Sequence, residues 1–350
     1  MVKHIETRGS HRDIGAAHGH EAAAEIQISL GNYARLFKDF AGIDWHQARY
    51  TAEMFKAAVE HTSPELLDEM AGIAEAANVD PLDILVLNSR SEIALTHFKP
   101  AQSDGCSALA QRHPDTKEQW LAQNWDWKHE AGEALIVLSA APTDKPAFHM
   151  VTEAGIIGKI GFNDRGIGVC LNALRSSICR PKLPVHVMLR RVLESDSVEH
   201  ALDMIDDLGV ASPAHFLIAD GEGHAAGMEV SPMGDSAIAP RNGNLFHTNH
   251  LIAKHLPPGL EDAPHEESFA RLARLKEISE GVSPSFDSLR DRLSDQHGTP
   301  DAIYRTENPN VPEPERMETL FTIIMNLSHK KAQVSFGTPS DAEEIIELHF

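Results

Sequence analysis

The chain has 350 residues, enough for one large domain or two small ones, and its hydrophobic content of 42% is ordinary for a globular protein. Its 31 Lys and Arg residues against 52 Asp and Glu residues give a formal net charge of −21. An acidic surface of this kind argues against nucleic acid and anionic membranes as partners.

The cysteine content and the apolar stretches indicate the compartment. The three cysteines, Cys106, Cys170 and Cys179, do not make a disulfide framework and fit a reducing environment. Residues 1–7 lack the apolar core of a signal peptide, and the longest apolar stretch, around residues 134–142, is far too short to span a bilayer. We therefore expect a soluble, cytoplasmic protein.

The first hundred residues are predicted to be helical. Residues 11–40 carry apolar side chains at helical spacing around an Ala-rich middle. Ser63 and Pro64 predict a helix start, with Ser63 as the cap and Pro64 at the first helical position. The dipeptide Asp80-Pro81 ends this helix, and residues 82–94 form a further helical segment.

From Cys106 onward, short apolar runs alternate with Gly, Pro and Asn/Asp turns, which predicts strands. The predicted strands are residues 106–111, 120–127, 134–138, 148–152, 158–162, 168–171, 215–219, 227–230, 245–248, 319–327 and 332–336. Helices are predicted at residues 183–194, 198–208, 266–280 and 286–293. This order predicts packed layers of helix and antiparallel sheet. The polar stretches 295–300 and 307–315 form a connector that is either a loop near the site or a surface excursion.

Cys106 lies in the string Ser103-Asp104-Gly105-Cys106-Ser107, and Asn124 and Asp126 follow on the next predicted strand. A thiol is a weak nucleophile until a base or a lowered pKa makes it a thiolate. A backbone cut before Cys106 would give it an α-amine, whose usual pKa of about 7.7–8.0 suits a general base. Gly105 suits the tight turn that such a cut needs, since it has no Cβ and accepts positive φ. Taken alone, the string more often marks a turn before a buried cysteine.

Several further segments change that balance, because together they resemble the penicillin acyltransferase (isopenicillin N acyltransferase) family of N-terminal-nucleophile (Ntn) enzymes. The similar segments are residues 104–107, 123–127, 158–163, 166–169, 172–174, 183–186 and 247–250. The resemblance implies an α+β fold, a four-layer α-β-β-α sandwich of Ntn-hydrolase type. It also implies self-cleavage between Gly105 and Cys106. The cut would divide one fold into a helical N-terminal segment, residues 1–105, and a β-rich catalytic segment, residues 106–350.

The resemblance assigns roles to three residues. Cys106 would be the nucleophile, with its freed amine as the base. Asp126 would hold the amine or orient the nucleophile, and Asn249 would donate a hydrogen bond to the oxyanion of the tetrahedral intermediate. The residues expected to line a substrate pocket are Asn124, Trp125, Trp127, His247 and Glu318.

Two details bear on the pocket. Where the family aligns a Ser-Arg pair, this chain has Met317 and Glu318, which argues against penicillin-type substrates and favours a cationic group. Strand alternation places Trp125 and Trp127 on one face, while Asn124 and Asp126 share the other face, toward the proposed site.

Other chemistries fit the sequence less well. A papain-like site of Cys106 with His247 and Asn249 needs no cut, but Cys106 starts a predicted strand and lacks the helix N-terminus that would lower its pKa. The 21 histidines show no zinc-ligand spacing. Gly155, Gly158 and Gly161 lack the strand–turn–helix context of a dinucleotide site. No metal and no cofactor are expected.

The sequence therefore predicts a self-processing cysteine amidohydrolase or acyltransferase that cleaves a small N-acyl or dipeptide-like amide through an acyl-enzyme. One alternative is an acyl-CoA-dependent N-acyltransferase acting on a small amine. A further alternative is a non-catalytic binding protein of the same fold, in which Cys106 is merely buried. The expected partners are a small-molecule amide, acyl-CoA in the first alternative, and the two processed chains for each other. Homo-oligomerisation is left open.

Overall fold

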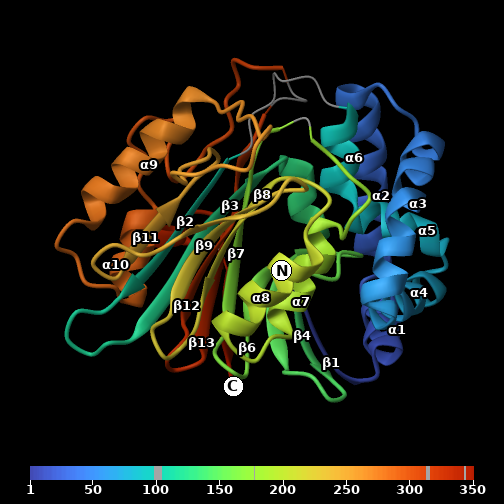
Figure 1. Ribbon diagram of the computed structural model, residues 1–350, viewed down its shortest axis with the longest axis horizontal. Helices are drawn as coiled ribbons and strands as arrows, with labels where there is room; N and C mark the ends of the chain where they lie inside the picture. Colours follow the sequence, from blue (N-terminus) through green and yellow to red (C-terminus); the bar gives the residue numbers. More distant parts are fainter. Residues whose placement is uncertain (98–104, 177, 313–315, 343) are drawn as a thin grey trace.

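The computed structural model describes residues 1–97, 105–176, 178–312, 316–342 and 344–350. Two β-sheets pack face to face, and helices cover the outer face of each sheet (Figure 1). The layers run from α9 (Glu266–Ser279) and α10 (Phe286–Leu293), through a six-stranded and an eight-stranded sheet, to the remaining helices. The predicted four-layer α-β-β-α sandwich is confirmed.

The eight-stranded sheet has the order β1-β4-β5-β6-β7-β8-β9-β10. All neighbours pair antiparallel except β1, which runs parallel to β4. The sequence did not predict β1, because this edge strand is polar and buries only Ile5. The bounds are β1 Lys3–Gly9, β4 Leu135–Pro142, β5 Phe148–Glu153, β6 Ile160–Asn163, β7 Gly168–Ala173, β8 Ala214–Ala219, β9 Ala225–Val230 and β10 Ser236–Ile238.

The six-stranded sheet is antiparallel throughout and has the order β11-β2-β3-β12-β13-β14. Its register pairs Gly105 with Asp126 and Cys106 with Trp125, so the candidate site residues lie on adjacent strands. The bounds are β2 Gly105–Arg112, β3 Gln119–Trp127, β11 Asn244–His247, β12 Glu318–Asn326, β13 Lys331–Phe336 and β14 Glu344–His349.

Helices dominate the chain before Cys106, as predicted from residue 11 onward. Ser63 is the N-cap residue of the fourth helix and Pro64 its first position, but the Ser63 side chain makes no capping hydrogen bond. Its backbone angles, φ −153° and ψ 56°, depart from the extended conformation of a side-chain cap. The bounds are α1 His11–Glu21, α2 Ala23–Leu36, the π-helix η1 Phe37–Ala41, α3 Trp45–Thr62, α4 Pro64–Ala77, α5 Pro81–Asn88 and α6 Arg90–His97.

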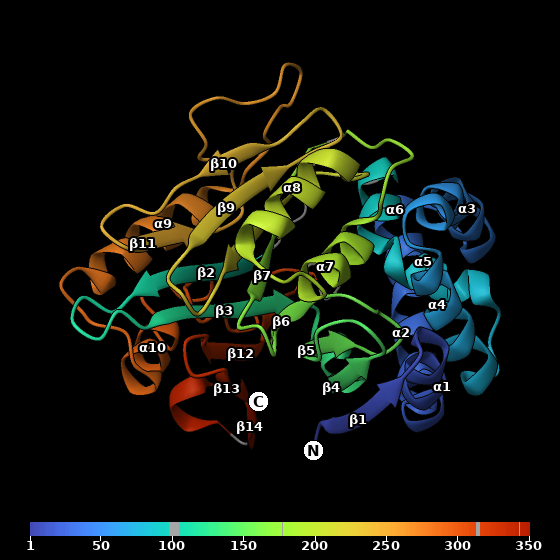
Figure 2. The ribbon, with the colours of Figure 1, turned by 60° about the horizontal axis from the view of Figure 1, so that its bottom comes forward.

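The remaining helices cover both sides of the sandwich (Figure 2). α7 (Val185–Leu193) and α8 (Val198–Leu208) lie against the eight-stranded sheet, and α9 and α10 lie against the six-stranded sheet. Short 3-10 turns occur at His129–Ala134 and Pro339–Asp341. Among the described residues, no helix combines the length and the apolar character needed to cross a membrane.

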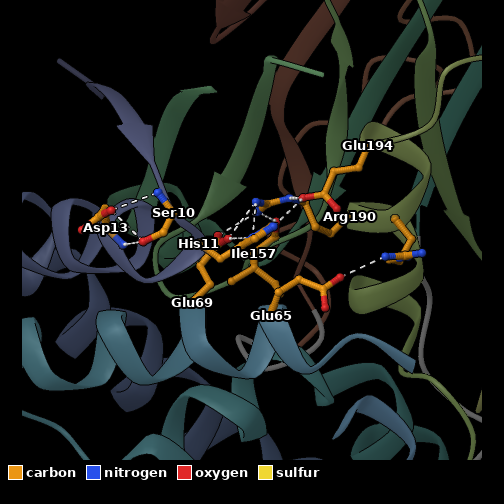
Figure 3. Close-up of polar contacts among 9 residues, drawn as sticks. Ser10, His11, Asp13, Glu65, Glu69, Ile157, Arg190 and Glu194 are labelled. Carbon is orange, nitrogen blue, oxygen red and sulfur yellow. Dashed lines mark hydrogen bonds and ion pairs between the residues drawn. The ribbon is translucent and has the colours of Figure 1, made fainter. Parts of the chain in front are cut away.

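A buried ionic cluster joins the helices that precede Cys106 to a helix that follows it (Figure 3). Arg190 of α7 is fully buried, and its two terminal nitrogens donate to the two carboxylate oxygens of Glu69 in α4, each at 2.7 Å. Arg190 Nε also donates to Glu194 at 2.8 Å, and His11 Nδ1 lies 2.9 Å from Glu69. Burial alone would raise the pKa of Glu69, but Arg190 and His11 lower it overall. The cluster therefore fastens α1 and α4 to the later part of the chain.

Candidate active site

The Cys106 side chain lies in the interior of the sandwich. Cys106 is directly opposite Trp125 in the β2–β3 register, so both side chains leave the sheet on the same face. Gln123 shares that face and hydrogen-bonds both the amide and the carbonyl of Leu171 in the other sheet. The Lys159 ammonium lies 3.3 Å from the centre of a Trp125 ring. The thiol therefore faces the eight-stranded sheet, within a buried layer of polar and aromatic groups.

The peptide groups on both sides of the Cys106 Cα are held by side chains. The Cys106 amide donates to Asn249 Oδ1 at 2.9 Å, and Asn249 Nδ2 donates to the Ala173 carbonyl at 3.1 Å. The Cys106 carbonyl accepts hydrogen bonds from Arg271 at 2.9 Å and from Asn172 at 3.1 Å. Arg271 also donates to Asn249 Oδ1 at 2.9 Å. The backbone at Cys106 is thus fixed from both directions, and Asn249 lies directly beside it.

Asp126 is the register partner of Gly105, and its carboxylate lies beside the Gly105 Cα, next to the Gly105–Cys106 bond. A Cβ added to Gly105 would be 2.5 Å from Asp126 Oδ2 and 3.0 Å from Arg305 Nε. Asp126 Oδ1 accepts from the Thr319 hydroxyl at 2.7 Å, whereas Oδ2 has no hydrogen-bond partner among the described residues. Burial raises the pKa of Asp126 to about 6, against the opposing effect of Arg305 and Arg271. A larger residue in place of Gly105 would therefore have to displace the Asp126 or Arg305 side chain. Ser103 and Asp104 lie outside the described residues.

Asn124 and Asp126 share a face of β3, and that face points toward α9 and α10, away from the Cys106 side chain. Asn124 Nδ2 donates to the carbonyls of Leu293 and Ile303, each at 2.8 Å. Asn124 Oδ1 accepts from the Thr322 hydroxyl at 2.6 Å. The Asn124 side chain therefore connects β3 to Leu293 and Ile303, which lie outside the sheet. Asp126 lies on the same outer face, next to the Gly105 backbone.

Both ring nitrogens of His247 interact with groups other than the Cys106 thiol. Its Nδ1 is 2.7 Å from the Thr248 carbonyl and its Nε2 is 3.1 Å from Glu229 Oε1, so both ring nitrogens face acceptors. Its ring stacks on His215 with centroids 3.4 Å apart. Because neither nitrogen is left to take a proton from Cys106, this arrangement disfavours a papain-like site.

The other expected pocket residues, Trp125, Trp127 and Glu318, lie along the end of β3 but have different surroundings. The rings of Trp125 and Trp127 stack with centroids 6.2 Å apart. Trp125 is buried beneath Lys159, while Trp127 lines a cleft of about 220 Å³ together with Tyr33 and Glu153. Glu318 lies across from Trp127 in the β3–β12 register. Its carboxylate is 2.5 Å from His129 Nδ1, a hydrogen bond that raises the pKa of His129.

Three buried cations near the site were not singled out from the sequence. Arg271 lies on the buried stripe of α9 with Leu272 and Leu275, and a basic residue on an apolar stripe is a detectable signal. Lys159 lies within a predicted strand, where a charged residue is likewise conspicuous. Arg305 lies between the two polar stretches of the connector, where nothing in the local sequence indicates that it is buried beside Asp126.

Comparison with known proteins identifies the chain's relatives. Residues 112–341 match the model of the family described as acyl-coenzyme A:6-aminopenicillanic acid acyl-transferase. The chain is also 30% identical over 349 residues to the 40 kDa form of acyl-coenzyme A:6-aminopenicillanic-acid-acyltransferase from Emericella nidulans, covering 99% of this chain and 96% of that protein. Matches of this length and identity place the chain in a class of acyl-transferring enzymes. It belongs to the acyl-coenzyme A:6-aminopenicillanic acid acyltransferase family, which confirms the resemblance found in its motifs.

Two solved structures are similar at lower identity. Penicillin V acylase from Agrobacterium tumefaciens is 13% identical with a TM-score of 0.47, over 70% of this chain and 86% of that one. A mutant of conjugated bile acid hydrolase from Clostridium perfringens is also 13% identical with a TM-score of 0.47, over 70% of this chain and 92% of that one.

Proposed function

We propose that the chain is a self-processing cysteine amidohydrolase. It cuts its backbone between Gly105 and Cys106 and then hydrolyses a small N-acyl or dipeptide-like amide. The observation that carries the proposal is the set of contacts around Cys106. Its amide is bound by Asn249, its carbonyl by Arg271 and Asn172, and Asp126 lies against the preceding glycine. Such preorganised contacts lower a barrier because they need no rearrangement at the moment of reaction.

The first reaction is an N-to-S acyl shift. Cys106 Sγ attacks the Gly105 carbonyl carbon, the carbon–sulfur bond forms and the Gly105–Cys106 amide bond breaks. The thiol proton ends on the departing Cys106 nitrogen, so the products are a thioester and a primary amine. Water then hydrolyses the thioester to a Gly105 carboxylate and a free thiol. The segments 1–105 and 106–350 would remain joined through the buried contacts between them, Arg190 with Glu69 among them.

The second reaction uses the new amine as the base. An amine that donates one N–H to Asn249 Oδ1, as the amide does now, keeps its lone pair to accept the thiol proton. The thiolate attacks the substrate carbonyl, and the amine side of the substrate leaves with that proton. Asn249 Nδ2 donates one hydrogen to Ala173 and has a second available for the oxyanion. Water, which is always present, then releases the acyl group.

The acyltransferase alternative has its own support. The family description and the relative from Emericella nidulans both specify acyl-coenzyme A as the donor. In that case Cys106 would take the acyl group from a thioester and pass it to the nitrogen of a small amine. The same nucleophile, base and oxyanion donor would serve, and only the acyl donor and acceptor would differ.

Trapping the acyl-enzyme tests the proposal and separates the alternatives. Purified protein is mixed with a panel of N-acyl amides or with acyl-CoA, quenched in acid and weighed. An acyl adduct on the fragment that begins at Cys106, absent in Cys106→Ser, is the expected result. Adducts from amides that decay in water support hydrolysis, and adducts that require acyl-CoA and decay only with an added amine support transfer. No adduct and no turnover with any donor would favour a non-catalytic binding protein.

A further inference from the structure

Lys159 lies fully buried on the same side of β3 as the nucleophile. Its ammonium is 3.3 Å from the centre of a Trp125 ring, and Trp125 is the register partner of Cys106. The ammonium and the thiol therefore share one face of the β2–β3 pair. Burial lowers the pKa of Lys159 to about 7, while Glu153 and the Cys106 thiolate both favour its charged form.

The carboxylate nearest to Lys159 is shared. Glu153 Oε2 binds both Lys159 and Arg90, the latter at 3.2 Å, and Glu153 Oε1 accepts from the Tyr33 hydroxyl at 2.5 Å. The single negative charge of Glu153 thus faces two positive charges and neutralises Lys159 only in part. The remaining positive potential of Lys159 extends toward Cys106. An anion formed on this face would be stabilised, since opposite charges interact strongly where water is excluded.

Among the residues that the structure describes, the other titratable groups around Lys159 are Tyr33, Cys170 and His186, and none of them supplies a competing anion. Burial raises the pKa of Tyr33 and of Cys170 far above their ordinary values, so both stay protonated, and burial lowers the pKa of His186, so it stays neutral. Arg271 adds positive charge near Cys106 from α9, and Asp126, whose carboxylate lies against Gly105, is on the opposite face of β3.

We propose that Lys159 is a positioning residue for the nucleophile: its buried ammonium stabilises the Cys106 thiolate in the self-cleavage step, before the α-amine exists. This inference rests on the proposed function. In that step the thiol proton moves to the departing Cys106 nitrogen, and Lys159 keeps its charge and forms no covalent bond. After the cut the amine supplies the base, so self-cleavage depends on Lys159 more than substrate turnover does.

The test measures how the reactivity of the Cys106 thiol depends on pH. Wild type, Lys159→Met, Lys159→Gln, Lys159→Arg and the exposed control Lys145→Met are treated with iodoacetamide across a pH series. To keep uncut chain available, the same variants are also made together with Asp126→Asn, which should block the cut. Alkylation of Cys106 is counted by mass on this uncut chain and, separately, on the fragment that begins at Cys106. In uncut chain, both neutral variants should shift the midpoint upward by about 1 pH unit or more, because a nearby cation lowers a thiol pKa by that amount. Lys159→Arg and Lys145→Met should stay near wild type.

The outcomes distinguish this inference from the proposal on which it rests. A neutral variant that unfolds cooperatively and keeps the wild-type midpoint would overturn the role of Lys159. Equal losses in self-cleavage rate and in turnover would also contradict it, because a structural defect would affect both. If no chain is ever cut, wild type included, self-processing fails, and the midpoint on uncut chain still decides whether Lys159 acts on the thiol.

Discussion

The Asp126 carboxylate lies against the Cα of Gly105, so closely that a Cβ there would be 2.5 Å from Asp126 Oδ2. That oxygen has no hydrogen-bond partner among the described residues, and it lies at the bond that we propose is cut. A change in the size of residue 105 or in the charge of Asp126 should therefore affect the same bond, Gly105–Cys106.

Gly105→Ala should slow self-cleavage by about 100-fold, because the new methyl group must displace either Asp126 or the backbone, and a misplacement of about 1 Å can cost that much in rate. The measurement is the fraction of cut chain against time by intact mass. Gly31→Ala is the matched control, since a Cβ at Gly31 meets nothing within 4 Å. Normal cutting of Gly105→Ala would show that the contact has no role.

Asp126→Asn should abolish cleavage yet stabilise the uncut fold at neutral pH. Burial raises the pKa of Asp126 from 3.8 to about 6. The contribution of the protonated carboxyl to the stability of the fold is therefore complete below about pH 4 and is lost as pH rises through 6. In a Cys106→Ala background, the substitution should gain about 2–3 kcal/mol at pH 7.5 relative to its effect at pH 4. Urea unfolding at both pH values checks this. An equal effect at both pH values would contradict the raised pKa of the buried Asp126 carboxyl.

Much of the sheet around the nucleophile could be predicted from the sequence. Residues 106–111 and 120–127 are apolar runs bounded by turn residues, so the sequence predicts both as strands. In the structure these strands pair antiparallel, which places Cys106 opposite Trp125. Asn249 could be named only through the family resemblance, because its bond to the Cys106 amide spans 143 residues. Nothing local encodes such a contact.

The cations of the site were harder to foresee for the same reason. Arg271 reaches the Cys106 carbonyl from α9, 165 residues away. Arg305 approaches Asp126 from between the two polar stretches of the connector, which the sequence placed either near the site or on the surface. Likewise, the polar strand β1 exists because its backbone pairs with β4, which no pattern within residues 3–9 reveals.

Arg271→Met should lower both self-cleavage and turnover by about 100-fold or more, because it removes the donors to the Cys106 carbonyl and to Asn249 Oδ1. Arg274→Met is the matched control on the same helix, where the arginine pairs with Asp295 near the surface. Rates are measured by intact mass and by substrate turnover. Equal rates for the two variants would contradict a specific role for Arg271.

Arg190→Met should destabilise the fold by about 3–5 kcal/mol, because it leaves Glu69 buried without its main cation. Arg191→Met, which removes the more exposed pair with Glu65, should cost about 1 kcal/mol or less. Denaturant unfolding measures both. In cut protein, Arg190→Met should also release the segment 1–105 at a lower denaturant concentration. A loss no larger than that of Arg191→Met would show that the cluster does not fasten α1 and α4 to the later part of the chain.

The most direct test of the account is the intact mass of the freshly purified wild-type protein under denaturing conditions, beside Cys106→Ala. We predict two wild-type fragments, one ending at Gly105 and one beginning at Cys106, and a single full-length mass for Cys106→Ala. A wild-type chain that stays whole while it turns over an amide, or a Cys106→Ala chain that still splits at this bond, would contradict the N-terminal nucleophile.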